Sequence, residues 1–308
     1  MRPQVPVMNE SIQTFFSCSQ IRSFLATAAT YLELTKPRLT FLAVLTTLAG
    51  FYLGSSNPFD HSAFVNTLIG AFLVGGGANA LNQFFEREAD ARMKRTENRP
   101  IPSARLTEEQ VFNFGLIFSV VGVLYFAFFV NPLSSLIALA ILVTYLVFYT
   151  PLKKKTEGAV FVGAIPGALP PVMGWAAARS SLDRGAWVLF FLLFLWQLPH
   201  FLAIAWMYRE DYKKAGLKTL ACRDERGEKT ARQIMFYCTV LLGISFVPSL
   251  IGMTSPVYLV WALLGGLAFL GLSLCRSLWG PAIYAKRLFL ASIIYLPVLI
   301  IAMLIHKI

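Results

Sequence analysis

Nine apolar runs, separated by charged residues, proline or glycine, dominate this 308-residue chain. A helix needs about 20 apolar residues to cross the hydrocarbon core of a bilayer. The runs lie near residues 39–55, 63–83, 111–130, 133–150, 158–178, 186–206, 233–251, 256–275 and 288–305. Pro132 and Pro256 stand in connections of a few residues, which force the adjoining runs into antiparallel hairpins. The sequence therefore predicts an all-α, polytopic membrane bundle of nine transmembrane helices.

The composition supports a membrane protein. Hydrophobic residues make up 56% of the chain and charged residues 14%, whereas soluble proteins have about 45–50% apolar and about 25% charged residues. The net charge of +11 does not indicate nucleic acid, because no stretch is long and polar enough to form a soluble domain. The cysteines are scattered without metal-ligand spacing, so we expect neither a disulfide framework nor a zinc site. They are Cys18, Cys222, Cys238 and Cys275.

The basic residues lie almost entirely on one side of the predicted bundle. The N-terminal tail and the loops 84–110, 151–157, 207–232 and 276–287 hold 24 of the 27 Lys and Arg residues. By the positive-inside rule, this side faces the cytoplasm, the N-terminus lies inside and the C-terminus lies outside. The same side holds 14 of the 16 carboxylates. Membrane topology does not require such a cluster of acids, so we expect the cytoplasmic face to use them.

A stripe of polar residues runs along the end of the second apolar run. At about 100° per helical residue, its members fall within an arc of roughly 100°: Asn79, Asn82, Gln83, Glu86 and Asp90. Glu88 and Arg92 point the other way. Carboxylates one turn apart suit Mg²⁺, which binds a few carboxylates together with substrate phosphate oxygens. The alternative is a hydrogen-bonded seam between helices, with Glu86 and Asp90 simply solvated.

Two further groups of residues fit a diphosphate site beside these acids. Cations that follow the stripe, among them Lys94, Arg95 and Arg99, could hold a diphosphate, or they could only set the topology. A second stripe in the sixth run and its exit echoes the first, and the two could enclose a metal–diphosphate site. It comprises Gln197, His200, Tyr208 and Asp211. Alternatively, His200 is a hydrogen-bonded histidine inside the membrane.

These motifs resemble the UbiA-type intramembrane prenyltransferases. Asn82-Gln83-Phe84-Phe85-Glu86-Arg87-Glu88-Ala89-Asp90 is similar to their first acidic motif. The branch that farnesylates haem is the most similar, through the segments 34–38, 149–153, 167–175, 196–201 and 211–216. Two departures are Tyr208-Arg209-Glu210-Asp211-Tyr212, where many members have D-x-x-x-D, and Leu217-Lys218 after Gly216, where the family usually has Pro-Met. The first departure argues against a 4-hydroxybenzoate-type acceptor.

The resemblance implies an enzyme that transfers the farnesyl group of farnesyl diphosphate to a vinyl group of haem B, giving haem O, with Mg²⁺ as cofactor. It implies that Glu86, Asp90 and Asp211 hold the metal and that Asn79 and Asn82 orient these ligands. Diphosphate would be bound by Lys94, Arg95, Arg99 and Lys153. Haem would be bound by Lys36, Arg38 and His200, with the histidine as a candidate axial ligand. Possible protein partners are haem A synthase and an assembly factor of a terminal oxidase.

The remaining expectations concern domains, location and rival functions. We expect a tail and interfacial helix over residues 1–33, although a transit peptide is an alternative, and one nine-helix domain over 34–308 with a cavity open to the cytoplasm. Without a long N-terminal extension, the chain fits a bacterial cytoplasmic membrane better than a mitochondrial one. The rivals are a UbiA-type enzyme with a quinone or chlorophyll precursor as acceptor and, from another class, a haem or polyprenyl transporter.

Overall fold

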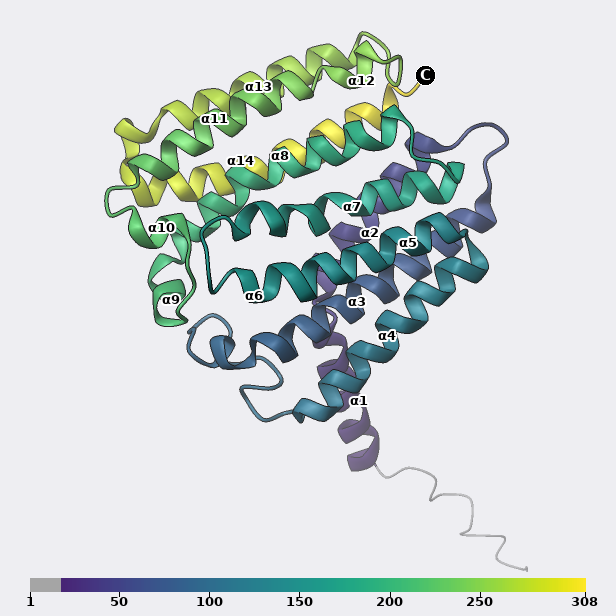
Figure 1. Ribbon diagram of the computed structural model, residues 1–308, viewed down its shortest axis with the longest axis vertical. Helices are drawn as coiled ribbons and strands as arrows, with labels where there is room; N and C mark the ends of the chain where they lie inside the picture. The colour runs from purple at the N-terminus through teal and green to yellow at the C-terminus, as the bar shows by residue number, and fades with distance from the viewer. Residues whose placement is uncertain (1–17) are drawn as a thin grey trace, which may run out of the picture.

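The computed structural model describes residues 18–308, and within this range the chain is helical, with one isolated β-bridge between Thr254 and Lys307 (Figure 1). Side chains are described from residue 22 onward. Of residues 1–33, for which a tail and interfacial helix or a transit peptide is expected, the first 17 lie outside the described residues. Helix α1 (Cys18–Leu34) projects away from the other long helices (Figure 1).

The nine predicted runs all fall in helices. The long helices that carry them are α2 (Pro37–Gly54), α3 (His61–Ala91), α4 (Glu108–Phe129), α7 (Ala159–Arg179), α8 (Arg184–Met207), α13 (Tyr258–Leu274) and α14 (Arg276–Ile305). The fourth run is divided into α5 (Pro132–Leu142), the π-helix η2 (Val143–Tyr149) and α6 (Thr150–Leu152). The seventh is divided into α11 (Glu228–Ile244) and α12 (Val247–Leu250). Two short helices, α9 (Arg209–Lys214) and α10 (Leu220–Arg223), lie in the loop after α8.

Eight of these helical segments in the described chain are long and apolar enough to cross a membrane. The remaining run, α13, is an apolar helix of 17 residues. The protein is therefore a polytopic, all-α membrane protein over the described residues. The expected number of nine spans depends on α13.

Contacts between distant segments define two ends of the bundle. At one end, Arg179 donates to the Gly54 carbonyl over 2.6 Å, and Lys307 donates to the Tyr52 carbonyl over 2.6 Å. At the other end, which we call the polar end, Lys36, Glu86 and Lys153 meet. Figure 1 shows the loops around α9 and α10 and the connection from α3 to α4 gathered at this polar end. Successive long helices therefore run in alternating directions.

Local sequence signals fix where the helices begin. Asp60 accepts a hydrogen bond from the Ala63 N–H at the start of α3, and Asn131 accepts one from the Ser134 N–H at the start of α5. Thr107 and Gln110 form a capping box at the start of α4. Because Asp60 begins α3 at the end opposite the polar one, its 31 residues extend beyond the apolar run and carry the acidic stripe on continuous helix.

Glycines bring α2 and α7 close together. A methyl group built on Gly174 of α7 would overlap the Thr47 carbonyl of α2, and one on Gly50 would overlap the Pro171 carbonyl. Close backbone approach at small residues is how membrane helices gain packing contacts without a hydrophobic driving force. The contact fixes the position of α2 against α7, and with it the position of the short junction between α1 and α2.

Candidate functional site

Helix α3 presents the predicted polar stripe to the interior of the polar end. The residues Asn82, Gln83, Glu86 and Asp90 are 3%, 3%, 6% and 1% exposed. Glu88, on the opposite face of the helix, is exposed. The predicted register of the stripe is therefore confirmed. Burial of two acids in one helix face means that their charge must be met by neighbouring groups.

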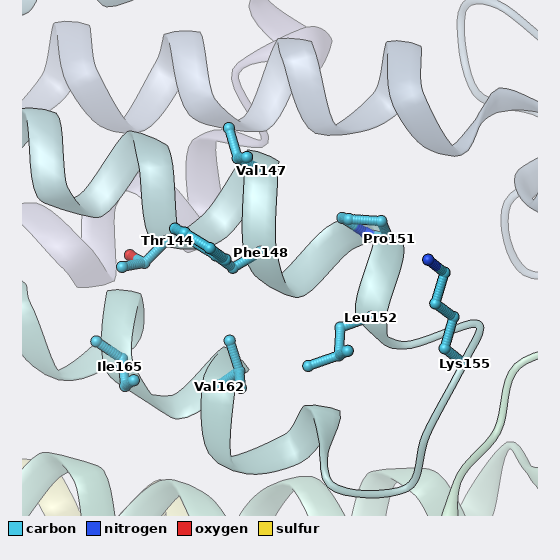
Figure 2. Close-up of a pocket in the computed structure, with 8 residues that line it drawn as sticks. All are labelled: Thr144, Val147, Phe148, Pro151, Leu152, Lys155, Val162 and Ile165. Atoms are coloured by element: carbon cyan, nitrogen blue, oxygen red, sulfur yellow. The ribbon is translucent and has the colours of Figure 1, made fainter.

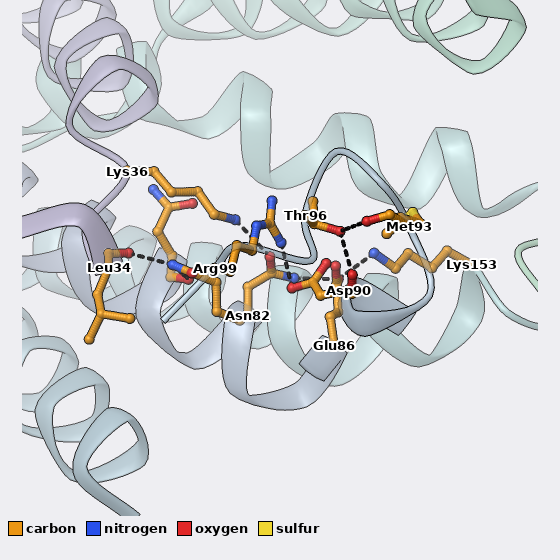
Figure 3. A network of polar contacts seen from close by, with 11 residues as sticks. Leu34, Lys36, Asn82, Glu86, Asp90, Met93, Thr96, Arg99 and Lys153 are labelled. Atoms are coloured by element: carbon orange, nitrogen blue, oxygen red, sulfur yellow. Dashed lines mark hydrogen bonds and ion pairs between the residues drawn. The ribbon is translucent and has the colours of Figure 1, made fainter. Parts of the chain in front are cut away.

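Three cations from other segments meet these acids, and we call the six residues together the polar cluster (Figure 3). Lys36 donates to the Asn82 side-chain oxygen over 3.0 Å, and the Asn82 amide donates to Glu86. Lys153, from the end of α6, forms an ion pair with Glu86. Arg99, from the loop after α3, forms an ion pair with Asp90 over 2.6 Å. The polar cluster therefore comprises Lys36, Asn82, Glu86, Asp90, Arg99 and Lys153, with three cations and two carboxylates.

Asp90 has one free oxygen in this cluster. Its Oδ2 accepts from Arg99, whereas its buried Oδ1 has no hydrogen-bond partner within the described part of the chain. The Thr96 hydroxyl donates to the Asp90 main-chain carbonyl over 2.8 Å and holds the following loop against the end of α3. A buried carboxylate oxygen without a partner is costly, so this atom is suited to a cation that arrives with the substrate.

The donor set fits magnesium when substrate supplies part of the coordination. Among residues 18–308, no three His, Cys, Asp or Glu side chains come together with metal-ligand geometry. Glu86 and Asp90 are therefore two carboxylates without a third, and the predicted third ligand, Asp211, lies on α9 and does not join them. Mg²⁺ is commonly held by one or two carboxylates together with substrate phosphates, and Glu86 and Asp90 meet that requirement.

Hydrogen bonds from α3 hold Lys36 in the polar cluster. Lys36 has left-handed backbone angles, φ 47° and ψ 65°, at the junction of α1 and α2. On the N-terminal side of Lys36, the Leu34 carbonyl accepts a hydrogen bond from the Gln83 amide over 2.8 Å. The Asn79 amide donates to the Thr35 carbonyl over 3.3 Å. The Asn79 amide also donates to the Thr40 hydroxyl over 3.0 Å. Asn79 and Gln83 therefore bind the α1–α2 junction and the start of α2 rather than the acids.

The surroundings of Lys36 lower the pKa of its side chain towards neutral pH. Burial, and next the positive charge of Arg99, lowers the pKa of Lys36 to about 7, although Glu86 and Asp90 oppose this shift. Lys36 was predicted to bind a haem propionate at the membrane interface. In the structure, the Lys36 ammonium lies in the polar cluster, where it contacts Asn82 close to the ion pair of Glu86 and Lys153.

The other predicted cations lie further out. The Arg95 guanidinium lies over the Tyr208 ring, 5.2 Å from its centroid, which brings the end of α8 next to the loop after α3. Lys94 and Arg38 are exposed. Of the four residues predicted to hold diphosphate, Arg99 and Lys153 therefore reach the acids, and Lys94 and Arg95 lie in the loop beside them.

The second predicted stripe does not face the first along its length. Gln197 donates to the Leu193 carbonyl over 3.0 Å and to the Ala164 carbonyl of α7 over 3.4 Å. His200 faces α14 instead, with its Nδ1 2.7 Å from the Ser292 hydroxyl oxygen. Tyr208, through Arg95, contacts the loop that carries Arg99. The spacing of the stripe predicted one face, but two of its residues bind different neighbouring helices.

The contacts of Ser292 fit one tautomer of His200. When the Ser292 hydroxyl donates its only proton to the Phe289 carbonyl, 2.6 Å away, its oxygen accepts the proton of the His200 Nδ1–H. The His200 Nε2 then carries a lone pair. The ring stacks on Trp196 and Phe289 at centroid distances of 4.9 and 5.2 Å.

A cavity beside the polar cluster contains residues that the sequence did not single out as site residues. Its volume is about 180 Å³, and it adjoins the cluster through Lys153. Tyr149, Tyr212 and Lys218 contribute polar groups to its wall, and the Lys218 N–H donates to the Lys153 carbonyl over 3.0 Å. Burial raises the pKa of Tyr212, which keeps its hydroxyl protonated. Tyr149 lies four residues before Lys153, a spacing that could have pointed to it.

Comparison with known proteins identifies the family. The profile of the UbiA prenyltransferase family matches residues 43–303. The chain belongs to the UbiA prenyltransferase family. This UbiA-family chain is 44% identical over 286 residues to the "Protoheme IX farnesyltransferase" of Solibacter usitatus (strain Ellin6076), in an alignment that covers 90% of this chain and 98% of the relative.

Solved structures of other UbiA proteins have the same fold as this UbiA-family chain. A structure of digeranylgeranylglyceryl phosphate synthase superposes with a TM-score of 0.77 at 18% identity, covering 91% of this chain and 98% of that one. A UbiA homologue from Archaeoglobus fulgidus bound to DMAPP and Mg²⁺ superposes with a TM-score of 0.67 at 16% identity, covering 89% and 99%. At such identities, the likeness establishes the fold alone.

Proposed function

We propose that this chain transfers the farnesyl group of farnesyl diphosphate to a vinyl group of haem B, giving haem O and diphosphate. The observation that carries the proposal is the 44% identity to a protoheme IX farnesyltransferase over nearly the whole length of both chains. The polar cluster supports it, because two buried carboxylates and three cations suit a magnesium–diphosphate group.

The residues of the polar cluster divide into two roles in this proposal. Glu86 and Asp90 hold Mg²⁺, with the free Oδ1 of Asp90 as one donor. Asp211 lies apart from them on α9 and would have to approach them to serve as the proposed third carboxylate. Asn82 orients Glu86 through its side-chain amide. Arg99 and Lys153 bind the diphosphate, and Lys94 and Arg95 extend this basic surface towards the cytoplasm. We add Lys36 to the diphosphate-binding residues, because its ammonium donates a hydrogen bond to Asn82 within the polar cluster.

The reaction breaks the bond between C1 of the farnesyl group and the diphosphate oxygen. When bound, Mg²⁺ stabilises the negative charge that develops on the leaving diphosphate. Lys36, Arg99 and Lys153 are already aimed at the same space, so their charge stabilises the leaving group without reorganisation. The terminal carbon of the vinyl group attacks farnesyl C1. Water then supplies a hydroxyl group to the other vinyl carbon and releases a proton, giving a hydroxyethylfarnesyl side chain.

The haem-binding residues in this proposal are His200 and Arg38. The Ser292 hydroxyl accepts the Nδ1 proton of His200 and leaves the Nε2 lone pair for the haem iron. This is how a histidine that ligates a metal is usually oriented by its second nitrogen. Arg38, exposed at the start of α2, binds a propionate.

We further propose nine membrane spans, a cytoplasmic polar end, and location in the cell membrane of a bacterium. Residues 34–308 form the catalytic domain, and α1 lies on the membrane surface. The predominance of Lys and Arg in the loops of the polar end supports this orientation. Product release into the bilayer would place haem O within reach of membrane-bound enzymes that process haem, such as a haem A synthase or a terminal oxidase assembly factor.

The test is an assay of membranes that contain the protein. Membranes are incubated with farnesyl diphosphate, Mg²⁺ and haem B, and the extracted haem is analysed by mass spectrometry. We expect farnesylated haem from the wild type and at least a hundred-fold less from Asp90→Asn, because removal of one preorganised electrostatic group costs about that factor. Glu88→Gln, on the exposed face of the same helix, is the matched control and should retain activity.

Three outcomes would contradict the proposal in different ways. Full activity of Asp90→Asn, with normal membrane insertion, would remove Asp90 from the site. Farnesylation of an added quinone precursor, but not of haem, would establish the same chemistry with another acceptor. Movement of haem or prenyl diphosphate across a sealed vesicle without covalent change would indicate a transporter.

A further inference from the structure

A second, apolar groove lies on the outside of the bundle, behind the segment that carries Lys153. It has a volume of about 300 Å³ and lies between η2 and α6 on one side and α7 on the other (Figure 2). Val147, Phe148, Leu152, Val162 and Ile165 form its apolar lining. Val147 and Phe148 are 61% and 55% exposed and belong to a segment long enough to span the membrane. The groove is therefore open to lipid.

The polar atoms of the groove are concentrated at one place. Thr144 needs no ligand, because its hydroxyl already donates to the Ala140 carbonyl over 2.6 Å. Lys155, at the cytoplasmic edge of the groove, is exposed and forms no ion pair with any described residue. The site therefore combines an apolar channel in the membrane with a single cation at its polar mouth. This is the complement of an amphiphile with an apolar chain and an anionic head group.

The chemistry of the groove separates a phospholipid from the prenyl substrate. A diphosphate that carries Mg²⁺ requires carboxylates, and none of the residues that line the groove is acidic. A phospholipid head group with one negative charge needs only a cation near the surface, and basic pockets between helices on the cytoplasmic side are known to bind anionic lipids. The groove therefore favours an anionic phospholipid over farnesyl diphosphate.

We propose that this groove binds an anionic phospholipid, with an acyl chain against Phe148, Val162 and Ile165 and the phosphate on Lys155. The same short segment, Pro151 to Lys155, directs Lys153 to Glu86 on its inner side and Lys155 to the groove on its outer side. A lipid bound outside thus restrains the segment that carries a cation of the polar cluster. The proposal does not depend on the identity of the acceptor.

Lipid retention by the full-length protein tests the site directly. The purified protein is equilibrated with equal amounts of phosphatidylglycerol and phosphatidylcholine, and retained lipids are counted by native mass spectrometry. We expect the wild type to retain phosphatidylglycerol preferentially, and Lys155→Gln to lower that preference about five-fold, the effect of one lysine near the membrane surface. The matched control is Lys229→Gln, an exposed lysine at the start of α11, which should not change it.

A second pair of variants tests the apolar channel. Val162→Trp fills the groove and should reduce retention of both lipids, whereas Val121→Trp, on the exposed face of α4, should not. Amide hydrogen exchange in residues 150–158 should be slower in phosphatidylglycerol than in phosphatidylcholine for the wild type, and equal in the two lipids for Lys155→Gln.

Each contrary result would overturn the proposal. Equal retention of the two lipids by the wild type, or an equal loss of preference in Lys155→Gln and Lys229→Gln, would show that no specific site exists. Displacement of the retained phosphatidylglycerol by farnesyl diphosphate without Mg²⁺ would identify the prenyl substrate as the occupant.

Discussion

At the scale of single residues, the position of Lys36 in the polar cluster depends on more than the hydrogen bond of its own side chain to Asn82. It also depends on hydrogen bonds from α3 to the two residues that precede it. The left-handed turn at Lys36 follows two residues whose carbonyls are bound by α3, Leu34 by Gln83 and Thr35 by Asn79. Gln83 occupies a place in the acidic stripe, yet it contacts main chain rather than a carboxylate. We expect it to act on catalysis through the position of Lys36.

The variant Gln83→Leu tests this role. Loss of the amide leaves the buried Leu34 carbonyl without a partner, at a cost of about 1–3 kcal/mol, and releases the junction that holds Lys36. We expect KM for farnesyl diphosphate to rise about ten-fold, with a smaller change in kcat. Steady-state kinetics in membranes measure both, and Glu88→Gln serves as the control on the exposed face of α3.

A double variant separates positioning from general damage. If Gln83 acts through Lys36, then Lys36→Gln combined with Gln83→Leu should have the KM of Lys36→Gln alone. Additive effects of the two changes on KM, or an unchanged KM in Gln83→Leu, would contradict the positioning role.

The sequence predicted the acids of the polar cluster but not all of its cations. The spacing of Asn82, Glu86 and Asp90 is a local property of one helix, and it could be followed by counting residues. Lys36 could not be placed in this way, because its direction depends on a left-handed turn and on hydrogen bonds across 46 and more residues. His200 was placed wrongly relative to α3 for the same reason, since its neighbour is Ser292.

At the scale of elements, the close contact of α2 and α7 sets the frame for the site. We expect Gly174→Ala to destabilise the protein, because its methyl group would overlap the Thr47 carbonyl, a main-chain atom that cannot move aside. Overpacking of this kind costs about 1–3 kcal/mol, which corresponds to a fall of roughly 5 °C in Tm. Thermal unfolding in detergent measures it.

The control for this change is Gly243→Ala. A methyl group at Gly243 of α11 meets no atom within 4 Å, so the substitution should leave Tm unchanged or raise it slightly, as expected for alanine in a helix. Equal Tm values for the two variants would mean that α2 and α7 are not in close contact.

The extent of the elements was predicted better than their internal form. All nine apolar runs are helical, because a run of apolar residues in lipid must satisfy its backbone hydrogen bonds internally. The π-helical turn at Val143–Tyr149 and the break at Gly280, with φ 70°, were not predicted. Such irregular turns depend on neighbouring helices that refill the altered hydrogen bonds, and hydropathy contains no information about them.

At the scale of the whole molecule, the two ends of the bundle have different chemistry. The polar end brings together Lys36, Glu86 and Lys153, whereas the opposite end is joined mainly by side chains that bind main-chain carbonyls, such as Arg179 on Gly54 and Lys307 on Tyr52. A diphosphate made in the cytoplasm would meet the cations of the polar end directly. The orientation of the molecule is therefore part of the proposed function.

The side on which the chain ends depends on α13. This helix has 17 residues and is about 25 Å long, slightly less than the hydrocarbon thickness of about 30 Å. If α13 crosses the membrane, the chain has nine spans and the C-terminus lies on the side opposite the polar end. The contact of Lys307 with Tyr52, at the end of α2 opposite the polar end, agrees with this arrangement. We therefore expect alkaline phosphatase fused after Ile308 to be active outside the cytoplasm, and the same enzyme fused after Lys155 to be inactive. A green fluorescent protein fused after Ile308 that fluoresces, together with an inactive phosphatase, would establish a cytoplasmic C-terminus and contradict nine spans.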